Sequence, residues 1–309
     1  MEPGARIYVA GHTGLAGSAI VRALERAAHS APLTRRHAEL ELTDAAAVRE
    51  FFRKEKPEYA FLAAAKVGGI LANDSYPADF IRQNLAIELN VIHEAWAAGV
   101  RRLIFLGSSC IYPRDCPQPI REEYFLSGPL EPTNRAYAVG KIAGVELCWS
   151  YNRQHGAKFL APMATNLYGP GDNYDPSGSH VLPALIRRFH EAKTRGDREV
   201  AVWGSGRPRR EFLYSDDLGD ACVFLMRLPE AEFNRLVAPG TTPIINAGVG
   251  KDLTIAELAA LVAEVIGFEG HLAFDAAKPD GTPRKMLDCS RMASLGWAPR
   301  TSLREGNTT

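Results

Sequence analysis

Short apolar runs alternate with amphipathic segments along the first two-thirds of the chain. The apolar runs have the length and composition of buried strands and lie at residues 7–10, 59–65, 103–108 and 159–166. The amphipathic segments repeat their apolar positions at the helical period and lie at residues 14–28, 45–54, 77–98 and 137–155. Strands that alternate with helices predict an α/β fold with a doubly wound parallel sheet, helices on both of its faces, and ligand sites at the carboxyl ends of its strands.

The pattern changes after Asn166. Residues 169–176 are rich in turn formers and predict a loop that leaves the sheet. The later segments predict a helix at 180–195, a strand at 199–203, a helix at 216–227, a connector through 240 and a helix that ends near 266. Thr254 and Glu257 have the spacing of a capping box at the start of that last helix. We therefore expect one domain over residues 1–170, to which 210–228 return, and a smaller mixed α/β domain over 171–309.

Composition and charge narrow the class of protein. The 309 residues are 46% hydrophobic and 23% charged, as in ordinary soluble globular proteins. The 36 Lys and Arg residues balance the 36 Asp and Glu residues, so we expect no nucleic-acid or membrane partner. No apolar run approaches the ~20 residues that span a bilayer, and the N-terminus leads into a strand without a signal-peptide pattern. Five scattered cysteines, an odd number without zinc-like spacing, indicate a reduced cytoplasmic protein with no metal site.

A glycine-rich motif joins the first predicted strand to the first predicted helix. It consists of Gly11, His12, Thr13, Gly14, Leu15, Ala16 and Gly17. The glycines allow a sharp turn, a close approach to a pyrophosphate and tight packing of the helix on the strand, and the helix N-terminus offers free amides to the phosphates. Between a strand and a helix, the motif predicts a nicotinamide dinucleotide site, and a tight turn without a ligand is the alternative.

Two arginines, Arg35 and Arg36, stand about where an NAD-specific site carries an acidic residue for the ribose 2′-hydroxyl. Guanidinium groups suit a 2′-phosphate far better than a free hydroxyl. The sequence therefore favours NADP. The alternative is that both arginines are solvated surface charges.

A phenol and an ammonium share one face of a predicted helix, because Tyr137 and Lys141 lie four residues apart. A nearby lysine lowers the pKa of a tyrosine, so the phenol can exchange protons near neutral pH. Ser108 ends the predicted strand at 103–108 and could polarise a substrate carbonyl. Cys110, two residues later, could be a buried packing residue, half of a disulfide, a metal ligand or a second catalytic group.

The glycine motif, the strand-end serine and the Tyr137–Lys141 pair occur in an order that resembles the extended short-chain dehydrogenase/reductase superfamily, which has a Rossmann fold. Further segments narrow the resemblance to the GDP-L-fucose synthase family, over about residues 6 to 305. These segments are residues 63–70, 107–113, 132–134, 165–170, 179–181, 202–206, 210–213 and 278–285.

The resemblance implies an NADP-dependent enzyme that epimerises carbons 3 and 5 of GDP-4-keto-6-deoxy-D-mannose and then reduces carbon 4. In the reduction, Tyr137 protonates the oxygen at carbon 4, Ser108 hydrogen-bonds it, and Lys141 tunes Tyr137 and holds the nicotinamide ribose. The family places the acid and base groups of the epimerisation at the positions of Cys110 and His180. A thiol and an imidazole can both exchange protons near neutrality. His180 could otherwise be a surface residue near a helix cap.

The resemblance also implies which residues bind the cofactor beyond the glycine motif. They are Arg35, Arg36, Leu106, Gly107, Ser108, Ser109, Lys141, Ala164, Thr165, Asn166, Leu167 and His180. Members of the superfamily commonly dimerise through two helices of each subunit. We expect a homodimer through the helices at 77–98 and 137–155.

By the same resemblance, Arg188, Trp203, Arg210 and Asp280 contact the GDP-sugar, with Lys285 a weaker candidate. Arginines can pair with diphosphate oxygens, and tryptophan offers an apolar face. From residue type alone, Trp203 could be core packing and Arg188 an exposed helix charge. The chain departs from the family pattern at a few places, since Thr13 and Ala164 replace a common basic residue and a common proline, and residues 302–309 stop where relatives continue into a helix. Competing functions are a related nucleotide-sugar 4-reductase or epimerase and a catalytically impaired NADP-binding protein.

Overall fold

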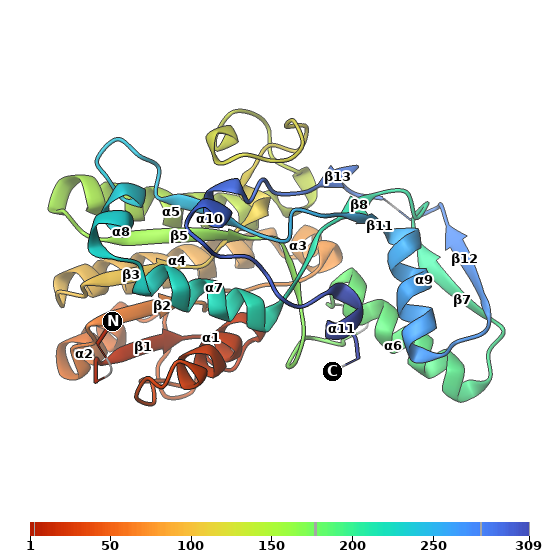
Figure 1. Cartoon of the computed structure of the whole chain (residues 1–309), viewed down its shortest axis with the longest axis horizontal. Helices are drawn as coiled ribbons and strands as arrows, with labels where there is room; N and C mark the ends of the chain where they lie inside the picture. Colours follow the sequence, from red (N-terminus) through yellow and green to blue (C-terminus); the bar gives the residue numbers. More distant parts are fainter. Residues whose placement is uncertain (3, 176–177, 279, 309) are drawn as a thin grey trace.

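The computed structural model describes residues 1–2, 4–175, 178–278 and 280–308, and its largest element is a parallel sheet (Figure 1). The strand order is β1 (Ile7–Ala10), β2 (Tyr59–Leu62), β3 (Arg102–Phe105), β5 (Phe159–Ala164) and β10 (Ile244–Ala247), and the short β4 (Gly107–Ser108) also pairs with β5. All of these pairings are parallel. The predicted doubly wound parallel sheet is confirmed.

Helices cover both faces of this sheet. α1 (Leu15–Arg26) and α7 (Ser215–Arg227) pack against one face, and α2 (Ala45–Glu55), α4 (Pro77–Ala97) and α5 (Arg135–His155) pack against the other. Neighbouring residues of a strand point to opposite faces, so Val9 joins the first core and Tyr8 the second. Because both faces are buried, these strands read as continuous apolar runs in the sequence.

A second unit contains α6 (Val181–Arg195), β7 (Glu199–Trp203), α9 (Ile255–Ile266) and β12 (His271–Asp275), gathered at the right of Figure 1. It has a core of its own, in which Phe189 and Leu258 are fully buried. The helices and the strand predicted here are found close to their expected bounds, and Thr254 and Glu257 form the predicted capping box.

Several short elements connect the two units or lie beside them. The strands are β6 (Asn166–Tyr168) paired with β9 (Phe212–Tyr214), and β8 (Arg209–Arg210) between β11 (Leu253–Thr254) and β13 (Arg284–Lys285). The helical turns are α3 (Ile70–Ser75), η1 (Ser109–Ile111), η2 (Glu122–Tyr124), η3 (Pro132–Asn134), α8 (Glu230–Leu236), α10 (Ser290–Ser294) and α11 (Leu303–Gly306). No helix in the described part of the chain is both long enough and apolar enough to cross a membrane.

Two features of the region after α7 differ from the expectation from sequence. The connector expected through residue 240 contains α8, and β10 joins the large sheet beside β5. The four residues of β10 follow Pro243 directly, include the polar Asn246, and are too short a run to be told from a loop by periodicity. The chain therefore returns to the large sheet once more than the predicted return of 210–228.

A buried carboxylate fastens three separate segments near the junction of the two units. Glu211, between β8 and β9, has no exposed surface. Its Oε1 accepts hydrogen bonds from the backbone N–H groups of Val249 and Gly250 at 2.5 and 2.6 Å, and its Oε2 accepts one from Leu287 at 2.9 Å. The carboxylate accepts three hydrogen bonds and donates none. An amide at this position would point its own N–H donors at the backbone N–H groups.

Replacement of Glu211 by glutamine is expected to lower the free energy of unfolding by about 3 kcal/mol, since the new NH₂ group would face backbone N–H donors that lose their acceptor. Urea denaturation followed by circular dichroism measures this. The matched control is Glu50→Gln, which removes an exposed ion pair with Arg53 and should change stability by less than about 0.5 kcal/mol. Equal losses in the two variants would contradict the assignment.

Candidate active site

The glycine-rich motif forms a tight turn after β1. Gly11 has φ of +84°, and a Cβ at this position would lie 2.6 Å from the backbone nitrogen of Ala64. A Cβ at Gly17 would lie 2.0 Å from the carbonyl oxygen of Gly11. The first turn of α1, all of whose residues are described, carries neither an acidic residue nor a side-chain cap, so its amide donors are available to an anion.

The two arginines proposed for the 2′-phosphate have different surroundings. Arg35 donates to Glu55 Oε1 at 2.8 Å, and its guanidinium lies 5.4 Å from the ring centroid of Phe51. Arg36 is exposed, and the hydrogen bonds found for it among the described residues, with Glu39 and Leu40, use only its backbone N–H and carbonyl. Arg36 thus has the more available charge, and Arg35 is already neutralised in part.

The functional atoms of Ser108 and Cys110 lie against each other. Ser108 ends β4, where it pairs with Ala164 of β5, and it caps η1. Its Oγ accepts a hydrogen bond from the backbone N–H of Cys110 at 3.3 Å and donates one to Cys110 Sγ at 3.2 Å. The thiol is half-buried and is not part of a disulfide.

Two further donors surround the Cys110 sulfur. Asn134 Nδ2, at the end of η3, donates to Sγ at 3.3 Å, and Lys285 Nζ, in β13, lies 3.9 Å away. Lys285, expected as a weaker sugar contact, is thus placed beside Cys110. The sulfur of Cys110 therefore faces a hydroxyl, an amide and an ammonium group from three separate segments of the chain.

The Tyr137–Lys141 pair lies on α5, as predicted, but its electrostatics differ from the expectation. Burial raises the pKa of Tyr137, the nearby Cys110 and Glu88 raise it further, and a hydrogen bond with Ser108 lowers it. Lys141 was expected to lower this pKa. Its Nζ lies 6.0 Å from the Tyr137 ring centroid and only 3.4 Å from Glu88 Oε1, so its charge is directed to the carboxylate. The expected lowering is therefore wrong for this arrangement.

His180 is the residue before α6, and its side chain is exposed. Desolvation by the surrounding protein nevertheless lowers its pKa, which favours the neutral imidazole. The loop before it is held by a hydrogen bond from Gly69 N to Gly178 O at 3.1 Å. Cys110 lies in η1 and His180 at the start of α6, and no hydrogen bond joins the two side chains within the described ranges.

The residues expected to contact the nucleotide form two groups. In one, the Arg188 guanidinium lies 4.6 Å from the ring centroid of Trp203, which is half exposed, and Lys278 Nζ lies 5.3 Å from the same ring. In the other, Asp280 accepts hydrogen bonds from the N–H and Oγ of Ser205, both at 2.7 Å. Trp203 is a surface residue, so the core-packing alternative does not hold.

The remaining polar candidates are partly engaged by the protein itself. Arg210 Nη1 donates to the carbonyl of Arg209 at 2.8 Å, and burial lowers the pKa of Arg210. Thr165 Oγ1 and Asn166 Nδ2 both donate to the Glu211 carbonyl, at 3.1 and 2.9 Å. These contacts fix the residues that follow β5 to the segment between β8 and β9. The other residues expected to contact the cofactor at the carboxyl ends of the strands of the large sheet are Leu106, Gly107, Ser109, Ala164 and Leu167.

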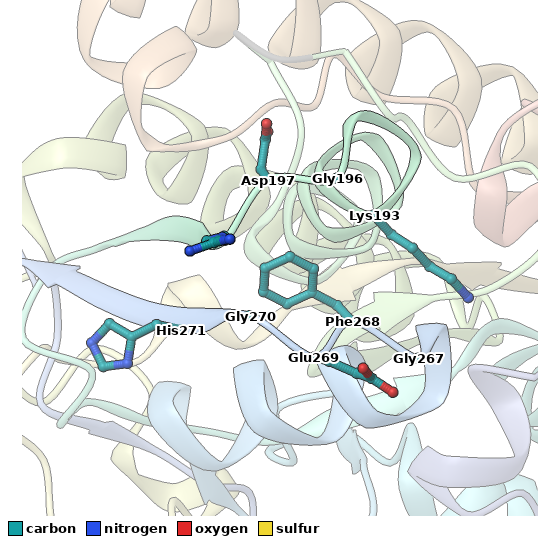
Figure 2. A pocket seen from close by; sticks show the side chains of 9 residues that line it. Lys193, Gly196, Asp197, Gly267, Phe268, Glu269, Gly270 and His271 are labelled. Carbon is teal, nitrogen blue, oxygen red and sulfur yellow. The ribbon is translucent and has the colours of Figure 1, made fainter.

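A large hollow lies away from these residues. It has a volume of about 630 Å³ and is lined by the ends of α6 and α9 and by the start of β12. Figure 2 shows the Phe268 ring at its centre, with the side chains of Lys193, Asp197 and His271 around it. It contains none of the residues named above, so its size does not mark it as the catalytic site.

Comparisons with known proteins agree with this geometry. The model of the NAD dependent epimerase/dehydratase family matches residues 7–238. GDP-L-fucose synthase 1 of Arabidopsis thaliana is 56% identical over 306 residues, which cover 99% of this chain and 91% of that protein. The GDP-L-fucose synthase of Escherichia coli K12 is 52% identical, covering 97% of this chain and 94% of that protein. The chain belongs to the GDP-L-fucose synthase family.

A solved structure of another GDP-sugar enzyme superposes on this member of the GDP-L-fucose synthase family. The GDP-mannoheptose C4 reductase of Campylobacter jejuni, solved with NADP bound, is 37% identical and superposes with a TM-score of 0.90 over 100% of this chain and 97% of that one. Its fold is the one described here.

Three residues near the site were not singled out from the sequence of this member of the GDP-L-fucose synthase family. Asn134 and Lys278 fall within segments that resemble the family, but the sequence predicts no contact for either of them. Glu88 falls in none of those segments. Of the three, Glu88 had a detectable signal, because it is an acidic residue on the apolar face of α4 and is buried. The contacts of Asn134 and Lys278 depend on loops that no sequence pattern places.

Proposed function

We propose that this protein makes GDP-L-fucose from GDP-4-keto-6-deoxy-D-mannose, by epimerisation at carbons 3 and 5 followed by NADPH-dependent reduction at carbon 4. One observation carries the proposal: Ser108 and Cys110 share a hydrogen-bonded group in a chain at least half identical to GDP-L-fucose synthases. A reductase needs the serine, whereas the thiol beside it supplies the acid or base group that inversion requires.

The reduction uses Ser108, Tyr137 and Lys141. Ser108 donates a hydrogen bond to the oxygen at carbon 4, and the Tyr137 phenol gives that oxygen its proton. A raised pKa keeps the Tyr137 phenol protonated before the transfer, which suits a proton donor. Lys141, on the same helix, holds the nicotinamide ribose.

The epimerisation uses Cys110 and His180. The ketone at carbon 4 acidifies the hydrogens at carbons 3 and 5, and inversion needs removal of a proton from one face and delivery to the other. The contacts of Cys110 Sγ with Ser108, Asn134 and Lys285 hold the thiol in place for this step. The lowered pKa of His180 favours the neutral imidazole, which can accept a proton.

NADPH supplies the hydride, and the residues present fit it. Gly11 and Gly17 leave space that a Cβ would fill, the first amides of α1 are free for a pyrophosphate, and Arg36 offers a charge for a 2′-phosphate. We further propose that Arg188, Trp203, Arg210 and Asp280 hold the GDP portion of the sugar. Arg188 and Trp203 already form a cation–π pair on the second unit.

Arg36→Ala is expected to raise KM for NADPH about 30-fold and to leave KM for NADH within about twofold, because a charged hydrogen bond to phosphate contributes about 2 kcal/mol. Steady-state kinetics with both cofactors measure the ratio. Glu39→Ala, beside it, is the control that removes no positive charge. A higher efficiency with NADH than with NADPH in the unmodified protein would overturn the assignment of NADP.

We also propose a cytoplasmic homodimer formed through α4 and α5, and a division into a cofactor domain at residues 1–170 with 210–228 and a substrate domain mainly at 171–309. The balanced charge and the five unpaired cysteines support a cytoplasmic protein. The separate core of α6, α9, β7 and β12 supports the division into two domains.

The experiment that tests the function mixes the protein, NADPH and GDP-4-keto-6-deoxy-D-mannose, follows absorbance and determines the product by NMR. GDP-L-fucose is the expected product. A 4-reductase is the second candidate, because a C4 reductase superposes on this chain with a TM-score of 0.90. Reduction without inversion at carbons 3 and 5 would establish that alternative.

A further inference from the structure

A buried carboxylate lies directly beside the lysine of the reductase group. Glu88, on α4, is 1% exposed, and its Oε1 lies 3.4 Å from Lys141 Nζ, whose side chain is 3% exposed. The ammonium also lies 4.5 Å from the ring centroid of Phe105. Lys141 is therefore held between a carboxylate and an aromatic face, on the boundary between α4 and α5.

The surroundings of Glu88 are tight and poor in donors. Neither carboxylate oxygen accepts a hydrogen bond of good geometry from any residue in the described part of the chain, and neither is accessible to solvent. A Cβ at Gly144 would lie 3.0 Å from Glu88 Oε2 and 2.4 Å from the Phe105 ring, so only glycine on α5 admits the carboxylate here. Burial of such an ion pair is a poor way to gain stability, which points to a use in the site.

We propose that Glu88 is a positioning residue of the reduction: its carboxylate is the counter-ion that keeps the buried Lys141 ammonium charged and fixed near Tyr137. The inference rests on the proposed function, because it assigns Glu88 to the hydride-transfer step and not to the epimerisation. Glu88 contacts neither the sugar nor the cofactor in this scheme and acts only through Lys141.

The electrostatics agree with this assignment. Burial lowers the pKa of Lys141 and Glu88 raises it again, whereas burial raises the pKa of Glu88 to about 7 and Lys141 opposes that rise. The other titratable groups that face the pair are Tyr137 and Cys148 on α5 and Cys110 on η1. Burial raises the pKa of Tyr137 and of Cys148, which keeps both neutral, and Glu88 is the main group that offsets the desolvation of the ammonium. Without Glu88, Lys141 would lose its proton at a lower pH.

The test is Glu88→Gln, which keeps the size of the side chain and removes its charge. The rate of reduction is measured against pH, and solvent-deuterium exchange at carbons 3 and 5 is measured in the same samples. We expect the alkaline limb of the reduction profile to move down by about one pH unit, a loss of about tenfold at pH values above the new limb. Exchange should stay within about twofold of the unmodified protein, since Cys110 and His180 are untouched.

Two companion variants separate positioning from structure. Glu94→Gln removes another buried carboxylate of α4, which Arg49 Nε contacts at 3.1 Å, and should leave the reduction profile unchanged. Glu88→Asp keeps the charge and should restore most of the alkaline limb. An unchanged profile in Glu88→Gln, or equal losses of reduction and exchange in Glu88→Gln and Glu94→Gln, would overturn the proposal.

Melting temperatures of Lys141 and Glu88 variants test the proposed ion pair without any measurement of enzyme activity. Lys141→Met leaves Glu88 buried without its cation, so the double variant Lys141→Met with Glu88→Gln should melt at a higher temperature than Lys141→Met alone. Equal melting temperatures would overturn the counter-ion assignment. If the unmodified protein neither exchanges nor reduces the GDP-sugar, the proposed function fails, and the melting comparison still decides whether Glu88 is the counter-ion of Lys141.

Discussion

Replacement of Tyr137 by phenylalanine should abolish reduction and leave most of the exchange at carbons 3 and 5. The phenol is the group proposed to protonate the oxygen at carbon 4, and its loss removes general acid catalysis, so the rate of NADPH oxidation should fall at least about 10³-fold. Phenylalanine keeps the ring, which packs edge-on against Phe80 with centroids 6.5 Å apart, so the fold should be retained. Absorbance of NADPH and NMR of the sugar in D₂O measure the two steps separately.

The matched control for this variant is Tyr151→Phe on the same helix. The Tyr151 hydroxyl contacts His93 Nδ1 at 2.7 Å, away from Ser108, and its loss should leave both steps within about twofold of the unmodified protein. A Tyr137→Phe variant that still reduces the sugar would remove Tyr137 from the mechanism. Loss of exchange together with reduction would instead mean that the phenol also serves the epimerisation.

The large sheet could be predicted because burial on both faces turns its strands into continuous apolar runs. The expected strand at 7–10 has the same bounds as β1, and the helix at 45–54 differs from α2 by one residue. β10 could not be predicted in the same way, since its four residues carry too little periodicity and its pairing with β5 depends on the completed sheet.

In the candidate site, too, contacts between residues close in sequence could be predicted, and contacts between distant segments could not. The motifs placed Ser108 beside Cys110 and put Tyr137 and Lys141 on one helix, because those relationships span only a few residues. The expected sign of the Tyr137 pKa shift was wrong because burial dominates the shift, with Cys110 and then Glu88 adding to it, and because α4 brings Glu88 to Lys141 from a distant part of the sequence. Such a contact follows from how the helices pack, which the motif does not encode.

Cys110→Ser and His180→Gln are each expected to lower inversion at carbons 3 and 5 at least about 100-fold, because each removes a group proposed to take or give a proton in that step. Serine can keep the hydrogen bond from Asn134 Nδ2, now 3.3 Å from the sulfur, so the loop should retain its shape. NMR of the sugar in D₂O measures exchange at each carbon. Cys116→Ser, another half-buried thiol, is the control and should exchange normally.

The stereochemistry of the exchanged sugar then separates the two functions of Cys110 and His180. The residue that removes the proton should be essential for any exchange, since no enolate forms without it. The residue that delivers the proton to the opposite face should be dispensable for exchange but not for inversion, because the base can return a deuteron to the face from which it took the proton. The variant that stops exchange altogether therefore identifies the base, and the variant that keeps exchange with retention of configuration identifies the acid. Normal exchange in both variants would refute the assignment of both residues.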